Sequence, residues 1–501
     1  MRPDGHEYRV ATRLPSAMKS FEAVFKAYDV RGVVPAELDA DMCRAIGVAF
    51  ARFCGSKRVI VARDARASGV ELAAAFMDGV LSECVEIADL GLASTDMLYF
   101  ASGKLDLPAV MFTASHNPGR YNGMKFCLAG ARPIGVETGL MDIRSIAEAA
   151  YDAAAARADS NPISGREVRD ATAAGAPEAS GPSGAKGVAR AAKVDLLQDF
   201  AEHVRSFVDL SVLRPLKVVA DVANGMGGLV VPRVFEELPF DLHILYPELD
   251  GTFPNHPADP IQPENLEDLK AEVLSREADV GLAFDGDADR VFLVDEKAEG
   301  VSGSLTTALV AKAMLAKQPG STILHNLICS KVVPEVIAEN GGTAVRTRVG
   351  HSFIKGIMAS TDAVFGGEHS GHYYFRDNFR ADSGLIAALL VLEVMSVAGK
   401  PLSELVSEFR RYASSGEINF TVADPASAVE SAAALYASSG ADVDLMDGLT
   451  VVMGNWWFNL RPSNTEPLLR LNVEAPTEEE CLRRVGEVRS SLEDAKLLGN
   501  K

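Results

Sequence analysis

The chain has 501 residues, of which 48% are hydrophobic and 24% charged, a composition typical of a globular protein of roughly three or four domains. Its formal net charge of −20 argues against non-specific binding to nucleic acid or to an anionic membrane, because phosphate-rich surfaces select clustered lysine and arginine. An anionic substrate would therefore need positive charge gathered locally.

Apolar runs of strand length alternate with amphipathic helical runs along the first half of the chain. Residues 57–62 read as a strand and 70–82 as a helix, and the same order returns at 216–221 and 229–238. This alternation predicts α/β layers with largely parallel sheets. Between the two pairs, residues 152–187 are rich in Ala, Gly, Ser and Pro and cannot bury enough apolar surface to offset their chain entropy. We predict a mobile surface insertion or linker there.

Three later segments share one plan, an apolar strand that ends in a polar loop. They are Pro108–Asn117, Ala278–Asp287 and Thr361–Ser370. Because ligands gather beyond the carboxyl ends of strands in α/β sheets, we expect these loops to face one cleft from three related domains. From about residue 416 the order changes to strand, helix and strand around 449–460, and a charged amphipathic helix follows at 477–492. This order is typical of a separate α+β domain.

The six cysteines form no Cys-x-x-Cys pair and no zinc-like spacing with histidine, which indicates free thiols in a reducing cytoplasm. The first twenty residues have no apolar core of a signal peptide, and the most apolar stretch, Leu385 to Val397, is short and interrupted by Glu393. We expect a cytoplasmic protein without a membrane span.

The first polar loop, Thr113-Ala-Ser-His-Asn-Pro118, carries a candidate nucleophile, Ser115. A serine hydroxyl alone is a poor nucleophile, and to accept a phosphoryl group it needs a base, a metal ion or a cation. His116, Lys125 and a bound cation are the candidates for that help. The alternative is a plain turn with a helix cap.

The second polar loop, Asp285-Gly-Asp-Ala-Asp-Arg290, places carboxylates at alternate positions, so that in an extended loop they project to one side. Asp285, Asp287 and Asp289 would repel one another without a counter-charge, and a divalent cation resolves that repulsion. Magnesium suits a phosphoryl-transfer site, because it combines a few carboxylates with phosphate oxygens.

The second loop has three other interpretations. A calcium-binding EF-hand is disfavoured because Arg290 stands where that loop needs glycine, and the flanks look like strands. A phosphatase with Asp285 as an aspartyl nucleophile stays open. A solvated acidic turn is a weak explanation for three crowded carboxylates after an apolar strand.

The third polar loop, Gly366-Gly-Glu-His-Ser-Gly-His372, offers a carboxylate, a hydroxyl and two imidazoles, groups that suit sugar hydroxyls. A glycine-rich turn is the alternative. His351 is a candidate for proton transfer, with a structural histidine as its alternative.

The loop Arg461-Pro-Ser-Asn-Thr-Glu-Pro467 combines a guanidinium, two hydroxyls and an amide, which is phosphate-binding chemistry. Such a loop would hold the phosphate that does not react, so that binding energy positions the one that does. A Pro/Ser/Asn turn is the alternative.

Together with Ala27-Tyr-Asp-Val-Arg-Gly32, and in this order over nearly the whole chain, these motifs resemble the α-D-phosphohexomutase family. The resemblance implies that Ser115 is a phosphoserine whose phosphate joins Asp285, Asp287 and Asp289 in binding Mg²⁺. It implies further site residues: Tyr28, Arg31 and Arg290 near the reacting phosphate, Lys125 and His351 as acid/base candidates, Glu368, Ser370 and His372 as sugar contacts, and Arg461, Ser463, Asn464 and Thr465 as the clamp of the distal phosphate.

The family fold implies three similar α/β domains with mixed sheets, a smaller C-terminal α+β domain, and an active-site cleft at their centre. The divisions expected for this chain are a phosphoserine-loop domain at 1–150, the insertion or linker at 151–190, a metal-binding domain at 191–300, a sugar-binding domain at 301–415, and a phosphate-binding domain at 416–501. The Glu-x-Ser-Gly-His form of the sugar loop and the segment Phe253–Pro260 resemble the phosphomannomutase/phosphoglucomutase branch. Two departures are Ala288, where the family usually has glycine, and the insertion.

The resemblance therefore implies interconversion of hexose 1-phosphates and hexose 6-phosphates, of mannose and also glucose, through Ser115 and a hexose 1,6-bisphosphate. Alternatives are a phosphoglucosamine mutase, against which Asn464 counts, a metal-dependent sugar phosphatase, and a non-catalytic sugar-phosphate binding protein. The expected partner is a small-molecule sugar phosphate, with no nucleic acid and no membrane, bound by a monomer or weak homodimer.

Overall fold

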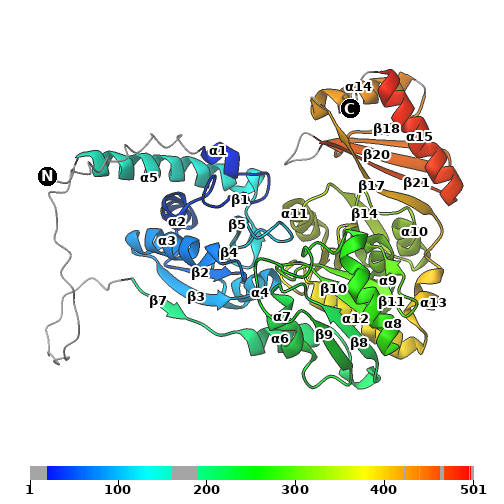
Figure 1. The fold of residues 1–501 in the computed structure, drawn as a ribbon, viewed down its shortest axis with the longest axis horizontal. Helices are drawn as coiled ribbons and strands as arrows, with labels where there is room; N and C mark the ends of the chain where they lie inside the picture. The colour runs from blue at the N-terminus through cyan, green and yellow to red at the C-terminus, as the bar shows by residue number, and fades with distance from the viewer. Residues whose placement is uncertain are drawn as a thin grey trace, which may run out of the picture.

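The computed structural model describes residues 20–160, 189–422, 424–438, 440–462, 468–495 and 497. Four separate sheets, of seven, five, four and five strands, divide these residues into four domains. In Figure 1 the first domain is blue to cyan, the second green, the third light green to yellow, and the fourth orange to red. Three α/β domains with mixed sheets and a smaller C-terminal domain confirm the predicted fold class.

The first domain contains α1 (Phe21–Val24), β1 (Val30–Val33), α2 (Ala40–Cys54), β2 (Arg58–Arg63), α3 (Ser68–Ser82), β3 (Glu86–Leu92), α4 (Thr95–Leu105), β4 (Ala109–Phe112), β5 (Tyr121–Leu128), β6 (Arg132–Pro133), η1 (Val136–Thr138), α5 (Leu140–Ser160) and β7 (Ala191–Lys193). The second contains α6 (Leu197–Arg205), η2 (Leu210–Val212), β8 (Lys217–Asp221), α7 (Gly227–Phe235), β9 (Asp241–Leu245), η3 (Pro263–Leu266), α8 (Glu267–Arg276), β10 (Val280–Phe284), β11 (Val291–Asp295) and β12 (Gly300–Val301).

The third domain contains α9 (Gly303–Lys317), β13 (Thr322–Asn326), α10 (Val332–Glu339), β14 (Thr343–Thr347), α11 (His351–Thr361), β15 (Phe365–Gly367), β16 (Tyr373–Phe375), α12 (Gly384–Ala398) and α13 (Leu402–Ser407). The fourth contains β17 (Ala413–Thr421), α14 (Pro425–Ser438), β18 (Asp442–Asp444), β19 (Leu449–Met453), β20 (Trp456–Pro462), β21 (Leu468–Ala475) and α15 (Glu478–Asp494).

The first three sheets repeat one arrangement of four consecutive strands. The third strand of each set lies parallel beside the first, the second lies on the other side of the first, and the fourth turns back antiparallel beside the third. The sets are β2–β5, β8–β11 and β13–β16. The three predicted polar loops are the connections β4–β5, β10–β11 and β15–β16, so they occupy equivalent places at the carboxyl ends of parallel strands.

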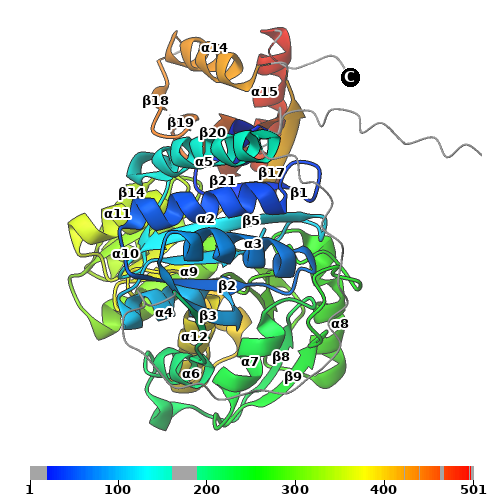
Figure 2. The ribbon, with the colours of Figure 1, turned by 90° about the vertical axis from the view of Figure 1, so that its left-hand side faces the viewer.

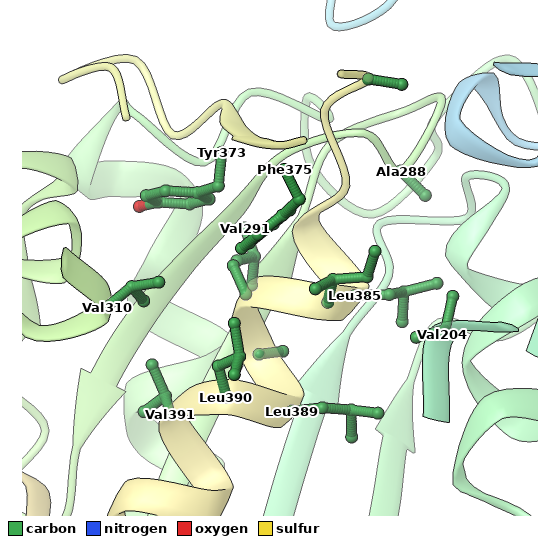
Figure 3. Packing of buried hydrophobic residues seen from close by; sticks show 14 of the residues in the cluster. Val204, Ala288, Val291, Val310, Tyr373, Phe375, Leu385, Leu389, Leu390 and Val391 are labelled. Carbon is green, nitrogen blue, oxygen red and sulfur yellow. The ribbon is translucent and has the colours of Figure 1, made fainter. Parts of the chain in front are cut away.

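The strands that precede the three loops, β4, β10 and β15, are buried at every residue because both faces of their sheets are covered. In β2, Ile60 and Ala62 point to the face of α4, whereas Val59 and Val61 point to the face of α2, α3 and α5, as the layers in Figure 2 show. The α4 face is continuous with one face of the second and third sheets. Figure 3 shows its centre, where α12 packs against β11, β16 and α9. The first three domains therefore share one large core, each of them has a further cluster of its own on the other face of its sheet, and the fourth domain has a separate core.

Glu393 interrupts the apolar run of α12 without reaching open solvent. Its carboxylate accepts the Asp209 backbone N–H at 2.8 Å and pairs with Lys317 at 2.5 Å. Among the described residues, no helix combines the length and apolarity that a membrane crossing requires.

The first residues of the expected insertion are helical. Helix α5 continues to Ser160, and residues 161–188 lie outside the described residues. Strand β7 then pairs parallel with β3, Ala191 opposite Ile87, before the chain enters the second domain at α6 (Figure 1). Both described ends of this segment thus belong to the first domain.

Candidate active site

A cleft of about 630 Å³ opens between loops of all four domains. Five cationic side chains line it against three anionic ones: Arg31, Lys125, Arg290, Arg461 and Arg470 against Asp29, Asp259 and Glu417. A chain of net charge −20 therefore gathers positive charge at one cleft, as an anionic ligand requires.

Ser115 lies on the β4–β5 loop and is buried, and its φ of 49° puts the backbone in the left-handed region that a side chain makes unfavourable. Its N–H donates to Thr113 Oγ1 at 2.9 Å, which holds the turn. Its Oγ donates to Asp285 Oδ2 at 2.8 Å and accepts from Arg290 Nη2 at 2.8 Å. The hydroxyl thus lies between a carboxylate and a guanidinium of the second domain.

His116 lies beside this hydroxyl, with Nδ1 at 3.4 Å from Ser115 Oγ and in contact with Arg290 Nη2. Burial, together with the charges of Arg290 and Arg31, holds the pKa of His116 well below its usual value. The imidazole is therefore neutral, and Nδ1 accepts a hydrogen bond instead of donating one.

The β10–β11 loop brings three buried carboxylates together, Asp285, Asp287 and Asp289, with one oxygen from each within 4.8 Å of the others. Among the described residues, Asp287 Oδ1 and Asp289 Oδ1 are buried without a hydrogen-bond donor. Hard oxygens that lack donors are what a divalent cation satisfies. The donor set therefore fits Mg²⁺.

Lys125, on β5, donates from Nζ to Asp287 Oδ2 and to Asp289 Oδ2, each at 2.8 Å. Burial acts to lower the pKa of Lys125, but the charges of Asp287 and Asp289 outweigh it and raise that pKa well above its usual value. Burial likewise acts to raise the pKa of Asp287, which the charge of Lys125 and its hydrogen bond bring below the usual range. Lys125 is therefore an ammonium ion at neutral pH.

Asp285 differs from Asp287 because it faces Ser115 and Arg290. Burial raises the pKa of Asp285 above its usual value, and the charge of Arg290 opposes this only in part. Arg290 Nε donates to Asp285 Oδ2 at 2.9 Å, and the Arg290 N–H donates to Oδ1 at 3.2 Å. Asp285 therefore anchors the guanidinium that contacts Ser115 Oγ.

The β15–β16 loop turns its predicted sugar contacts in different directions. Ser370 and His372 line the cleft, whereas Glu368 lies behind its wall and is 2% exposed. Glu368 accepts three hydrogen bonds, from Tyr374 Oη at 2.8 Å, Asn326 Nδ2 at 3.2 Å and the Gly350 N–H at 3.3 Å. A sugar hydroxyl would have to compete with these donors for the Glu368 carboxylate.

His372 lies between two carboxylates, with Nδ1 at 2.8 Å from Asp382 Oδ2 and 3.8 Å from Asp289 Oδ1. Burial acts to lower the pKa of His372, but the charge of Asp289 and the hydrogen bond with Asp382 outweigh it and raise that pKa above its usual value. The imidazolium form is thus favoured next to the carboxylate cluster.

Tyr28 and Arg31 approach from the start of the first domain. Arg31 Nη1 donates to Asn117 Oδ1 at 2.6 Å, so the guanidinium lies beside the loop of Ser115, and its Nε is buried without a partner among the described residues. Tyr28 Oη donates to the Val349 carbonyl of the third domain at 3.1 Å.

The fourth domain contributes Arg461 on β20. Its Nη2 lies 3.6 Å from Glu417 Oε2, and Arg470 Nε lies 3.5 Å from the other oxygen of the same carboxylate. The remaining residues of the predicted clamp, Ser463, Asn464 and Thr465, lie outside the described residues. His351 is the first residue of α11, and its side chain is likewise outside them.

Models of one family match the chain domain by domain. The matching descriptions are phosphoglucomutase/phosphomannomutase alpha/beta/alpha domain I at residues 22–153, domain II at 198–300, domain III at 302–412, and the C-terminal domain at 417–491. The chain belongs to the phosphoglucomutase/phosphomannomutase family. The resemblance drawn from its five motifs is thereby confirmed.

Named relatives of the phosphoglucomutase/phosphomannomutase family align over most of the chain. A phosphohexose mutase of Xanthomonas campestris pv. campestris is 41% identical, covering 90% of this chain and 94% of the relative. A phosphomannomutase of Escherichia coli K12 is 37% identical with the same coverage of both chains. The crystal structure of a phosphoglucomutase/phosphomannomutase family protein from Burkholderia thailandensis superposes with a TM-score of 0.81 at 31% identity, covering 96% of this chain and 98% of that one.

Arg66, in phosphoglucomutase/phosphomannomutase domain I, is a site residue that sequence reasoning missed. Its side chain has no exposed surface and pairs with Asp64 at 3.0 Å. Its two terminal nitrogens donate to four carbonyls of the loop that carries the candidate nucleophile: Ser115 at 2.7 Å, Asn117 at 2.6 Å, Pro118 at 2.8 Å and Tyr121 at 3.0 Å. A signal was available, because Asp64-Ala-Arg66 directly follows β2, the parallel neighbour of β4.

Thr95 is a second missed residue, at the start of α4 in domain I. Its Oγ1 donates to Asp287 Oδ2 at 2.7 Å, and its N–H donates to the Asp287 carbonyl at 3.0 Å. The neighbouring Asp96 accepts from Ser383 Oγ of domain III at 2.8 Å. In the sequence, Ser94-Thr95-Asp96 reads only as a helix N-cap, because its partners come from other domains.

Proposed function

We propose that this protein interconverts the 1-phosphates and 6-phosphates of mannose and glucose through a phosphorylated Ser115. The observation that carries the proposal is the position of Ser115 Oγ, which lines the cationic cleft while hydrogen-bonded to Asp285 and Arg290. Membership of a family of hexose phosphate mutases, which are isomerases, supports the reaction class.

In the proposed cycle, phosphorylated Ser115 donates its phosphoryl group to the free hydroxyl of a hexose 1-phosphate or 6-phosphate. The bond from phosphorus to Ser115 Oγ breaks, a bond from phosphorus to the sugar oxygen forms, and that hydroxyl gives up its proton to His351. The leaving Ser115 Oγ takes up a proton, for which Lys125, the other acid/base candidate and already an ammonium ion, is the proposed donor. The resulting hexose 1,6-bisphosphate turns round and returns its other phosphoryl group to Ser115. The serine therefore ends each cycle as it began.

Charge in the cleft supports this assignment. Arg290 contacts Ser115 Oγ and Arg31 contacts Asn117 on the same loop, so both would stabilise negative charge that develops during phosphoryl transfer, which is the main catalytic task in such reactions. We propose that Ser370 and His372, with Glu368 behind them, bind the sugar. Arg461, with Ser463, Asn464 and Thr465, would hold the phosphate that does not react, so that either orientation of the bisphosphate is anchored.

We propose Mg²⁺ as the cofactor, held by Asp285, Asp287 and Asp289 together with the phosphate on Ser115. The two carboxylate oxygens without donors support this assignment. When bound, the ion would neutralise charge on the phosphoryl group that is transferred. Removing divalent ions with EDTA should abolish turnover, and added Mg²⁺ should restore it.

The sugar phosphate is the proposed partner, and we propose that the enzyme works as a monomer or weak homodimer. A phosphatase with an aspartyl nucleophile is less well supported. Ser115 lines the cleft, whereas Asp285 lies behind it and already accepts hydrogen bonds from Ser115 and Arg290.

The test is Ser115→Ala, assayed with mannose 1-phosphate, glucose 1-phosphate and glucosamine 1-phosphate in the presence of Mg²⁺ and catalytic hexose 1,6-bisphosphate. We expect the wild-type enzyme to convert the first two and the variant to convert neither, because the phosphate carrier is gone. Phosphopeptide mapping should find the phosphate on Ser115. Retained turnover in the variant, or a hydroxylamine-sensitive phosphate on Asp285, would contradict the proposal, and a strong preference for the glucosamine phosphate would reassign the substrate.

A further inference from the structure

In the loop Arg348–Gly350, between β14 and α11, a single residue, Val349, forms hydrogen bonds with two other domains. The Val349 carbonyl accepts from Tyr28 Oη of the first domain at 3.1 Å, and the Val349 N–H donates to Asp447 Oδ2 of the fourth domain at 3.0 Å. One peptide segment of the third domain thus lies between a hydroxyl and a carboxylate that belong to different domains.

The next residue leaves this loop little freedom. The Gly350 N–H donates to Glu368 Oε1 at 3.3 Å, and a Cβ on Gly350 would lie 2.7 Å from Cζ of the Tyr28 ring. Its φ of +129° is open to glycine and strained for other residues. Helix α11 begins at the following residue, His351, so the loop sets where that helix starts.

Asp447 is in turn fixed to the strand that carries Arg461. Asn459 Nδ2, on β20, donates to the Asp447 carbonyl at 3.2 Å. A Cβ on Gly448 would lie 2.5 Å from the Leu460 carbonyl and 2.8 Å from Arg461 Cα, so the two backbones are in close contact. The turn that carries Asp447 therefore moves with Arg461.

These contacts form one connection, from Arg461 through the Asp447 turn to the loop that starts α11. The two phosphates of a hexose bisphosphate are separated by a distance that the sugar ring fixes. The group that holds one phosphate and the group that serves the other must therefore keep a fixed spacing. The hydrogen bond from a backbone N–H to a carboxylate is strong, so it suits that purpose.

We propose that Asp447 is a positioning residue, which sets the start of α11 and hence His351 at a fixed spacing from the distal-phosphate clamp at Arg461. The inference rests on the proposed function, in which His351 is an acid/base candidate. It concerns how the fourth domain contributes to the chemical step, beyond holding the substrate.

The same turn supplies a matched control. Asp444, at the end of β18, pairs with Arg346 on β14, so it also joins the fourth domain to the third. It contacts a strand instead of the loop that starts α11. Asp444 Oδ1 also accepts the Met446 N–H at 2.9 Å within the turn. Asp444→Asn, whose amide oxygen can keep that bond, therefore weakens the charged domain contact without releasing Val349.

The experiment compares Asp447→Ala, Asp447→Asn and Asp444→Asn in the full-length enzyme, with glucose 1-phosphate as substrate and saturating Mg²⁺ and bisphosphate. We expect Asp447→Ala to lower kcat at least tenfold while KM changes less than threefold, because the chemical group is misplaced and the clamp is intact. Asp447→Asn, whose amide oxygen can accept the same hydrogen bond, and Asp444→Asn should both stay within about threefold of wild type. Intact-mass analysis should find wild-type phosphorylation of Ser115 in all three.

Equal kcat in Asp447→Ala and Asp444→Asn would overturn the inference, as would a loss confined to KM or an Asp447→Asn variant as slow as Asp447→Ala. If Asp447→Ala does not fold, Gly350→Ala disturbs the same loop from the side of Tyr28 and should show the same loss of kcat at unchanged KM; unchanged kcat there would also overturn it. A wild-type enzyme without turnover refutes the proposed function, whereas an active wild type with these results refutes the positioning role alone.

Discussion

His256, in the second domain, has a hydrogen-bond acceptor at each ring nitrogen. Nε2 lies 2.9 Å from Asp221 Oδ2, and Nδ1 lies 2.9 Å from the Pro257 carbonyl. Only the doubly protonated ring can donate to both acceptors. Burial acts to lower the pKa of His256, but the hydrogen bond and charge of Asp221 outweigh it, and the net pKa is raised.

This raised pKa makes the contribution of His256 to stability depend on pH. It is fully present below the unfolded value of about 6.5 and is lost as the pH rises through the higher folded value. His256→Gln should therefore lower the free energy of unfolding by about 1.5 kcal/mol at pH 5.5 and by much less at pH 9. Urea unfolding at the two pH values measures the difference, and an equal or larger loss at pH 9 would contradict the assignment.

Ala288 shows how one departure from a family pattern is accommodated. Its φ of 59° lies in the left-handed region, which explains why glycine is usual at this position. The methyl group of Ala288 is buried in the shared core (Figure 3). All three carboxylates of the loop remain together despite the substitution.

At the scale of elements, the three loops that meet in the cleft are held by side chains from outside them. The clearest case is Arg66, which binds four carbonyls of the Ser115 loop and never reaches the cleft lining among the described residues. A planar guanidinium can serve several acceptors at once, whereas the ammonium of lysine is a single compact donor.

We therefore expect Arg66→Lys to keep the charge opposite Asp64 but to release part of the loop. The predicted result is a kcat at least tenfold lower, with reduced phosphorylation of Ser115 by hexose 1,6-bisphosphate, measured by intact mass. Arg44→Lys, on the exposed face of α2, is the control and should change neither. Full activity of Arg66→Lys would show that the loop keeps its shape unaided.

The elements of the site were open to prediction where the signal is local. The strands before the three loops are apolar because both sheet faces are covered, and that pattern is visible in the residues themselves. The side chains that hold the loops were not predictable, since Ser115 is 49 residues from Arg66 and Asp287 is 192 residues from Thr95. The inward turn of Glu368 likewise depends on Tyr374 and Asn326, whose positions only the fold defines.

At the scale of the whole molecule, one core joins the first three domains, whereas the fourth packs around its own. Helix α12 lies at the centre of the shared core, and Leu389 on it is 1% exposed (Figure 3). Domains that share buried apolar surface are expected to unfold together.

Leu389→Ala should therefore destabilise all three α/β domains together, by about 3 kcal/mol, and leave the fourth unchanged. Hydrogen exchange should show faster exchange of slow amides in all three sheets. Leu482→Ala, on the exposed face of α15, is the control and should change stability by less than about 0.5 kcal/mol. Faster exchange confined to the third domain would show that the domains unfold independently.

The return of the chain to β3 through β7 has a consequence for how the enzyme can be assembled. Because α5 ends just before residues 161–188 and β7 follows them at the sheet edge of the same domain, a break within them divides only one pair of described strands, β3 and β7, between two chains. Two polypeptides produced from a gene divided there would each carry one partner of the β3–β7 pairing, along with complementary parts of the shared core. We expect them to combine when co-expressed, with the second chain donating its first strand to the sheet of the first.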